Sequence, residues 1–301
     1  MLLQKYCSFI ILYNFKEEKV KQEEVFSEFK VPRVLPVKEE PPDRRILPLH
    51  PNIPGIPSLI LCIAGYNSGK TTLINSMLLQ SRENGFYGAQ DLFDEVIIMS
   101  NTINNDPCAR FLKKAFTVTD GYSDGAITEL YNKQKSYGEK RNAPFIALFA
   151  DDILGKNLKR NSELSFFATR FRHANCGLLA IFTQNFKSVD TILRNNSSDI
   201  IIFKQTNKKQ LLQIEEEYGG VYEGKFLELY KIATKNKYSF LYLRMKSGEA
   251  FRNFEEKIGE YGNILVGERI SDTEAGLPTD TGAVPDPPEL ITEETKTKNG
   301  R

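Results

Sequence analysis

Short apolar runs recur through the middle of the chain, and segments of helical length separate them. The runs begin at residues 58 (SLILCIA), 95 (EVIIMS), 145 (FIALFA), 177 (GLLAIFT) and 199 (DIIIFK). Consecutive apolar positions over so short a length are typical of strands buried on both faces. Five such strands alternating with helices predict an α/β fold with a mostly parallel five-stranded core sheet flanked by helices. YSFLYLRM, from residue 238, alternates more loosely and follows a predicted helix at 224–235, so we expect a late edge strand or hairpin element there.

The two ends of the chain differ in composition from this central body, which we place at residues 57–266. Residues 1–56 are charged and then rich in proline, which predicts an extended arm. Residues 267–301 hold almost no large apolar side chains, so a disordered tail is expected. The apolar start, MLLQKYCSFIILYNF, has a short core and no small-x-small cleavage site. We therefore expect a protein that is not secreted and does not span a membrane.

A phosphate-binding motif follows the first apolar run, in the stretch IAGYNSGKTTLINSM at residues 63–77. A strand, a tight glycine-containing turn and a helix over 71–80 would present backbone N–H groups and a positive dipole end to an anion. Lys70 would reach the β- and γ-phosphates of ATP, and the Thr71 hydroxyl would ligate Mg²⁺. The residues assigned to nucleotide binding are Gly65, Tyr66, Asn67, Ser68, Gly69, Lys70, Thr71 and Thr72.

The motif departs from the strict spacing G-x-x-x-x-G-K-[ST] at one position, because Ala64 stands where the first glycine is expected. Alanine is the mildest replacement for glycine. The competing interpretation is a chance Gly-Lys-Thr in an ordinary turn, and the predicted strand and helix on either side argue against it.

Two adjacent carboxylates, Asp151 and Asp152, end the strand predicted in PFIALFADDILG. A nucleotide site needs acid opposite the phosphate loop, because Mg²⁺ prefers carboxylates and waters. We assign Asp151 to the metal and Asp152 to the general base that orients the attacking water. The alternative for an isolated Asp-Asp is a helix N-cap.

Gln184 ends the next apolar strand, in GLLAIFTQN. In P-loop ATPases with an additional strand between the phosphate strand and the acidic strand, a polar residue at this place contacts the water or the γ-phosphate. The alternative is a simple strand cap. Arg170, Arg172 and Arg194 lie close by in sequence and are candidates for an arginine finger supplied across a subunit boundary, with Arg194 the first choice and Arg172 the second.

Composition excludes fewer functional classes than these motifs do. A chain of 301 residues with 41% hydrophobic residues can build a large core, and a net charge of +1 argues against a surface-wide nucleic-acid coat. The four cysteines form no C-x-x-C pair, which favours a reducing compartment. With only two histidines, a histidine-rich metal site is excluded.

The order of these motifs resembles the FtsK/HerA superfamily of P-loop ATPases, and within it the poxvirus-type genome-packaging ATPases of large DNA viruses and virophages. The similar segments, between residues 49 and 256, are LPLHPNIPGIPSLILCIAGYNSGKTT, FIALFADDIL, RFRHANCGLLAIFTQNFKSVDTILRNNSSDIIIFK and YKIATKNKYSFLYLRM. The Arg-His before the glutamine strand and the Arg-Asn after it are the more specific part, because many unrelated enzymes share phosphate loops.

This resemblance implies an additional-strand, RecA-like fold and an ATP-driven motor that threads double-stranded DNA into a capsid. It also implies a homo-oligomeric ring (hexamer or pentamer), a capsid vertex or portal partner, and a location in the host cytoplasm or viral factory, and in the virion. Basic clusters at Lys156, Lys159 and Arg160, and at Lys204, Lys208 and Lys209, could track DNA phosphates without reading bases. The alternative for these clusters is solvated loops.

Two other functional classes stay open at this point. A small-molecule or nucleotide kinase uses the same phosphate loop. A kinase is expected to have an arginine-rich lid, whereas this chain has a strand that ends in Gln184. The second class is a non-catalytic assembly protein that binds nucleotide as a structural ligand. The predicted general base, Asp152, argues against this class.

Overall fold

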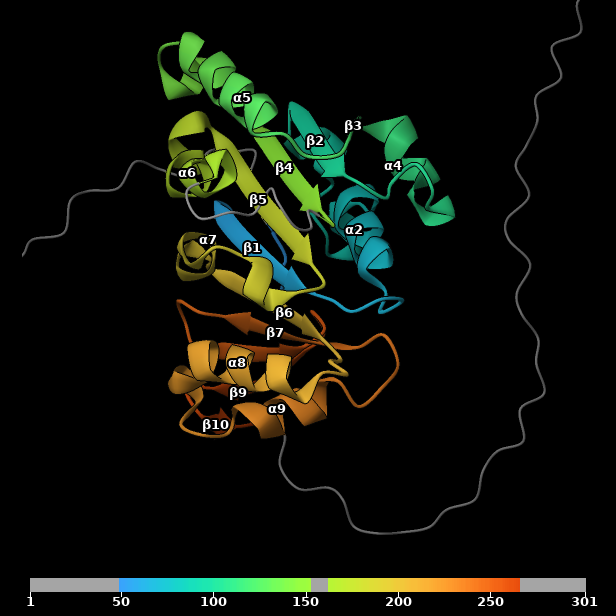
Figure 1. Cartoon of the computed structure of the whole chain (residues 1–301), viewed down its shortest axis with the longest axis vertical. Coiled ribbons are helices and arrows are strands. Elements are labelled where there is room, and N and C mark those ends of the chain that lie inside the picture. Colours follow the sequence, from blue (N-terminus) through green and yellow to red (C-terminus); the bar gives the residue numbers. More distant parts are fainter. Residues whose placement is uncertain (1–48, 153–161, 266–301) are drawn as a thin grey trace, which may run out of the picture. The chain divides into compact units, whose positions relative to one another are not determined.

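A single sheet of ten strands organises the part of the chain that the computed structural model describes, residues 49–152 and 162–265 (Figure 1). The strand order across it is β10-β9-β8-β7-β6-β1-β5-β4-β2-β3. The strands are β1 (Ser58–Ile63), β2 (Glu95–Ser100), β3 (Thr117–Asp120), β4 (Ile146–Asp151), β5 (Cys176–Thr183), β6 (Asp199–Phe203), β7 (Phe240–Arg244), β8 (Glu249–Arg252), β9 (Glu256–Glu260) and β10 (Asn263–Ile264).

The parallel part of the sheet runs from β3 to β6 and contains all five strands predicted from the apolar runs. The predicted number of five is wrong, because β3 is a sixth parallel strand. Its sequence, TVTD, is only four residues long, and none of its residues is buried. An exposed strand at the border of a sheet has no need of the continuous apolar run that marks its neighbours.

The late strand predicted from YSFLYLRM is β7, and it pairs antiparallel with β6. It is not itself the edge of the sheet, because β8, β9 and β10 continue as an antiparallel meander beyond it. These later strands were not predicted because they are short and partly exposed, so sequences such as EAFR and EKIGE contain no long apolar run. The prediction of a mostly parallel sheet followed by a late strand or hairpin element is confirmed, and the structure shows that the late strands are antiparallel.

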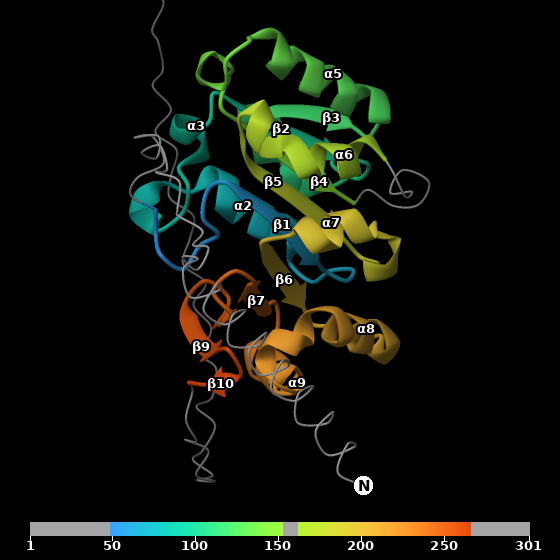
Figure 2. The same cartoon turned by 90° about the vertical axis from the view of Figure 1, so that its left-hand side faces the viewer.

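Helices cover both faces of the parallel strands (Figure 2). On one face, β1 contributes Leu59 and Leu61 to a core cluster that also holds Leu164 and Phe167 of α6. The six residues of β1 are all buried, as expected for a strand covered on both sides. The helices are α2 (Lys70–Leu79), α3 (Ala89–Leu92), α4 (Arg110–Ala115), α5 (Asp124–Ser136), α6 (Glu163–Arg170), α7 (Thr191–Asn196), α8 (Lys208–Tyr218) and α9 (Phe226–Ala233).

The residues just before β1 pack on the sheet instead of leaving it. Ile53 is buried, the Tyr87 hydroxyl donates to the Pro54 carbonyl at 2.8 Å, and Arg244 of β7 donates to the Pro51 carbonyl at 2.7 Å. Residues 1–48 and 266–301, which hold most of the predicted arm and all of the predicted tail, lie outside the described residues, so the division into arm, body and tail stays a prediction. No helix among the described residues has both the length and the apolar character needed to cross a membrane.

Candidate nucleotide-binding site

The predicted phosphate loop joins the end of β1 to the start of α2. Asn67 and Gly69 have left-handed backbones, with φ of 52° and 101°, and the Ser68 hydroxyl donates to the Gly65 carbonyl at 2.8 Å. No side chain caps α2, and its first turn carries no acidic residue. The first N–H groups of the helix therefore have no partner within the helix and lie at the positive end of its dipole, which suits an anion.

The alanine that departs from the strict motif sits where a side chain is tolerated. The Ala64 N–H donates to the Thr183 carbonyl at 2.9 Å, which extends the pairing of β1 with β5 by one residue. Ala64 is buried, and its φ is not positive. A glycine is needed for a left-handed backbone or a close approach, and neither applies at this position.

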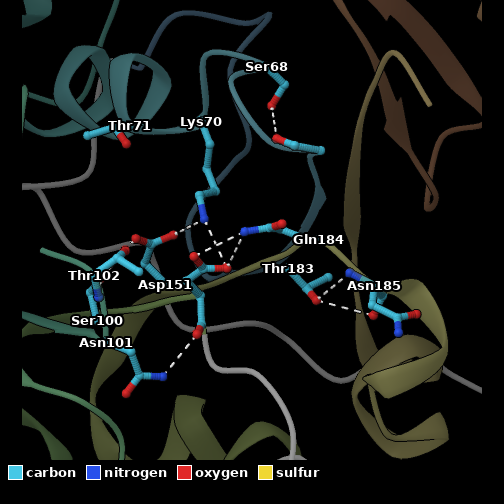
Figure 3. Close-up of polar contacts among 12 residues, drawn as sticks. Ser68, Lys70, Thr71, Ser100, Asn101, Thr102, Asp151, Thr183, Gln184 and Asn185 are labelled. Carbon is cyan, nitrogen blue, oxygen red and sulfur yellow. Dashed lines mark hydrogen bonds and ion pairs between the residues drawn. The ribbon is translucent and has the colours of Figure 1, made fainter. Parts of the chain in front are cut away.

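Lys70, the first residue of α2, makes two ion pairs with the acidic strand end (Figure 3). Its Nζ lies 2.9 Å from Asp151 Oδ1 and 3.3 Å from Asp152 Oδ1. Burial disfavours the charged ammonium, but the two carboxylates outweigh this and hold the pKa of Lys70 above its ordinary value. Burial raises the pKa of Asp151, although the Lys70 charge and the Ser100 hydroxyl act in the other direction.

The sheet order explains why these side chains meet. β5 lies between β1 and β4, which is the additional-strand arrangement that the motifs predicted. Ile63 of β1 is aligned with Thr183 of β5, and Asp151 of β4 is aligned with Phe182 of β5. The carboxyl ends of three parallel strands therefore share one edge of the sheet, where the phosphate loop begins.

Asp152 is held in a strained backbone conformation directly after β4. The φ of Asp152 is 52°, its N–H donates to the Phe182 carbonyl at 3.1 Å, and its backbone carbonyl accepts from Asn101 Nδ2 at 3.0 Å. Both oxygens of its carboxylate accept from Gln184 Nε2, at 3.0 and 3.2 Å. A non-glycine residue kept in this conformation by several bonds is a common feature of functional sites. Gln184 thus contacts the residue assigned as the base.

The assigned metal ligands are oxygen donors of the kind that Mg²⁺ prefers. The Thr71 hydroxyl donates to Asp106 Oδ2 at 2.7 Å, and Asp151 Oδ2 accepts from Ser100 at 3.0 Å. In phosphate sites Mg²⁺ takes one or two carboxylates together with waters and phosphate oxygens. A hydroxyl and a carboxylate at this edge of the sheet fit such a cation.

The two preferred arginines differ in their surroundings. Arg194 on α7 forms a short ion pair with Glu217 of α8, and its guanidinium lies 4.9 Å from the centre of the Phe186 ring. Arg172 is exposed, and its guanidinium lies 5.5 Å from the centre of the Phe171 ring. Neither is placed beside Lys70, so the structure does not bring these arginines into the site of their own chain.

One of the two predicted basic clusters is described, and it lies near the glutamine strand end. Lys204, Lys208 and Lys209 are exposed, whereas 153–161, which holds the other cluster, lies outside the described residues. Gln210 in the first turn of α8 donates to the Gln184 carbonyl at 3.2 Å and to Gln205 Oε1 at 2.6 Å. The helix that carries two of these lysines is therefore bonded to the Gln184 segment.

Four polar residues of the site were missed by sequence reasoning. Ser100 is the last residue of the run EVIIMS and Asn101 follows it, so their position at a strand end was a usable signal. Asp106 accepts from the Cys108 N–H at 2.8 Å and begins the 3₁₀ turn Pro107–Ala109, so its sequence context indicates only a cap. Gln210 gave no signal, since its role depends on how α8 packs.

Comparisons with known proteins found structural similarity only. No protein-family model and no curated protein matches the chain. The genome packaging NTPase B204 from Sulfolobus turreted icosahedral virus 2, in complex with AMP, is 18% identical with a TM-score of 0.48, over 64% of this chain and 95% of that chain. B204, the DNA-packaging ATPase from Sulfolobus turreted icosahedral virus, is 15% identical with a TM-score of 0.47, over 67% and 97%. The pCW3 conjugation coupling protein TcpA, with ATPγS, is 12% identical with a TM-score of 0.41, over 62% and 57%.

Proposed function

We propose that this protein is a P-loop ATPase that hydrolyses ATP to move double-stranded DNA, and that it packages a viral genome into a capsid. The observation that carries the ATPase proposal is the cluster of Lys70, the Asp151–Asp152 pair and Gln184 at the start of α2. It combines a phosphate-binding cation, metal-binding oxygens and a base with its orienting amide, which are the parts that ATP hydrolysis needs.

Phosphate binding begins with an exchange of partners at Lys70. The triphosphate would lie against the N–H groups of the loop and of the first turn of α2, and the Lys70 ammonium would turn from the carboxylates to the β- and γ-phosphates. Thr71 and Asp151 would hold Mg²⁺, which when bound supplies positive charge that neutralises the phosphate oxygens.

Hydrolysis then requires a water in line with the bond between the γ-phosphorus and the bridging oxygen. Asp152 accepts a proton from this water as its oxygen attacks the γ-phosphorus, and the electron pair of the broken bond leaves with ADP. Gln184 keeps the Asp152 carboxylate in place through its two contacts, and it can contact the γ-phosphate or the water as the lysine moves away.

The motor part of the proposal rests on the resemblance of the motifs and on the exposed lysines near Gln184. Lys204, Lys208 and Lys209 can contact DNA phosphates without sequence preference. Gln210, on the helix that carries Lys208 and Lys209, donates to the Gln184 carbonyl. A movement of Gln184 during ATP hydrolysis can therefore shift these lysines. A homo-oligomeric ring, a capsid vertex or portal partner and action in the host cytoplasm complete the proposal.

The test is the ATPase rate of the full chain with and without duplex DNA, together with the oligomer mass in the presence of ATP. Hydrolysis that DNA accelerates in a ring-sized oligomer is the expected result, and Lys70→Ala is the inactive control. Transfer of phosphate to a small-molecule or nucleotide acceptor, without DNA stimulation, would replace the motor with a kinase. Nucleotide binding without any turnover would replace it with an assembly protein.

A further inference from the structure

A cavity of about 890 Å³ opens beside the phosphate loop, on the side away from Asp151 and Asp152. The loop and α2 contribute Asn67, Gly69 and Thr72 to its lining. Pockets that bind nucleotide-sized ligands have volumes of about 300–1,000 Å³. The cavity is therefore large enough for a nucleoside, and it begins where the phosphates are proposed to lie.

Aromatic side chains from separate parts of the chain form much of this cavity, namely Phe86, Phe203, Tyr238, Phe240 and Phe254. Phe203 and Phe240 are buried, with ring centres 5.1 Å apart. Phe86 and Phe254 are half-buried and meet edge to face at 6.2 Å. Flat apolar walls of this kind suit a planar base, which can stack on aromatic rings.

Tyr238 lies where this cavity meets the phosphate loop. It is 51% exposed, although it is large and aromatic. Its φ of 67° is a strained value for a residue with a bulky side chain. A methyl group at Gly69 would meet the Tyr238 ring at 3.5 Å, so this ring lies against the last residue of the phosphate loop. The Lys237 ammonium lies 4.7 Å from the centre of the same ring.

One polar group of the cavity is fixed in orientation. Asn253 Oδ1 accepts from the Phe240 N–H at 3.2 Å, so the oxygen end of the amide is in use. The nitrogen end is the one that can meet a ligand, and it donates. Ring nitrogens of purines accept such hydrogen bonds.

We infer that this cavity binds the purine nucleoside end of the nucleotide, with Tyr238 stacking on the base beside the phosphate loop. The inference rests on the proposed function, because the loop must hold the phosphates for the base to reach Tyr238. It assigns the base to the β6–β7 side of α2 and the reacting phosphate to the β4–β5 side. Tyr238 thus becomes the residue that holds the base by stacking, and Asn253 supplies the donor that a ring nitrogen of the base can meet.

The test uses binding of MgATP, MgCTP and magnesium tripolyphosphate to the full chain by calorimetry. Tyr238→Ala is expected to weaken ATP binding by about 5- to 150-fold, the range that base stacking on an aromatic side chain gives, and to leave tripolyphosphate binding unchanged. Tyr238→Phe keeps the ring and should bind ATP like the unaltered chain. Tyr261→Ala is the matched control, because Tyr261 is 53% exposed with a φ of 44° and lies outside the cavity lining.

The outcomes separate this inference from the proposed function. If the unaltered chain binds tripolyphosphate as tightly as ATP, or ATP no better than CTP, the nucleoside assignment is overturned while the phosphate loop stands. Equal loss of ATP and tripolyphosphate binding in Tyr238→Ala also overturns it, since the tyrosine would then support the loop only. If the unaltered chain binds neither compound, the phosphate loop itself and the proposed function fail.

Discussion

Removal of the Lys70 ammonium should destabilise the chain even in the absence of nucleotide. Its ammonium lies between two carboxylates, and the side chains of Lys70, Asp151 and Asp152 are only 12%, 10% and 8% exposed. Lys70→Met keeps most of the length and apolar character of the side chain but leaves two buried negative charges without their counterion. The perturbation is therefore electrostatic and leaves the packing nearly unchanged.

The size of the effect follows from the distances. At 2.9 and 3.3 Å each ion pair is worth about 5–6 kcal/mol at an effective dielectric constant of about 20. The cost of burying the ammonium offsets a large part of this attraction, and loss of one partner from a buried pair costs about 3–5 kcal/mol overall. We expect the free energy of unfolding of Lys70→Met to fall by that amount.

The loss should also depend on pH. Burial raises the pKa of Asp151, and the Lys70 charge counteracts that rise, so the pKa increases further when the charge is removed. A carboxyl with a higher pKa in the folded state binds its proton more tightly there, and stability then falls as the pH rises from the unfolded value through the folded one. Lys70→Met should therefore be less destabilised at about pH 5 than at about pH 8.

Urea unfolding followed by circular dichroism, without nucleotide, measures both effects. Lys70→Arg retains a charge and should lose less, and the double variant Lys70→Met/Asp152→Asn should recover part of the stability by removing one of the two unpaired carboxylates. A Lys70→Met variant as stable as the unaltered chain at about pH 8 would refute this reasoning. So would a double variant no more stable than the single one.

The remaining predictions concern turnover. Asp152→Asn should bind MgATP and fail to release phosphate, because only the base is neutralised; normal hydrolysis there, with loss of hydrolysis in Asp151→Asn, would reverse the two roles. Gln184→Ala should retain its nucleotide affinity and lose DNA stimulation of the ATPase, whereas unchanged stimulation would contradict its assigned part. Arg172→Ala or Arg194→Ala should lose about 10³-fold or more in turnover if either is the finger, and mixing with Lys70→Ala should restore activity in mixed rings. Mixed oligomers that stay inactive would exclude a finger supplied by the neighbouring subunit.

The parts of the fold that the sequence predicted are those whose residues are buried on both sides. The runs around Leu61, Phe149 and Ile181 are apolar at consecutive positions because helices cover both faces of their strands. β3 and β10, which lie at the two borders of the sheet, have no buried residue, and β8 and β9 each bury only two adjacent residues in the middle of the strand. A short, half-exposed strand leaves too little pattern to separate it from a loop.

The site residues that were predictable belong to local sequence motifs, whereas those that were missed depend on contacts between distant parts of the chain. Lys70 and Thr71 were predictable because a strand, a turn and a helix start follow one another in sequence, and Gln184 because a polar residue ends an apolar strand. Asp106 bonds Thr71 across 35 positions of sequence. Its contribution depends on the packing of a connecting segment against α2, which no sequence period records.

The choice between the two arginines depends on where the strands begin. Arg172 comes before Cys176, the first residue of β5, and the eight residues of that strand place it about 23 Å or more from Gln184 at the other end. Arg194 lies closer to Gln184, because its guanidinium is 4.9 Å from the centre of the Phe186 ring, two residues after Gln184. An arginine side chain is too short to cross such a strand, so a finger from Arg172 would have to act on a neighbouring subunit. Arg194 would first have to leave Glu217 and the Phe186 ring, which are half-buried and buried, whereas Arg172 is already exposed. Arg172 is therefore the more accessible of the two, and the order of preference between them stays a prediction that the mixed oligomers test.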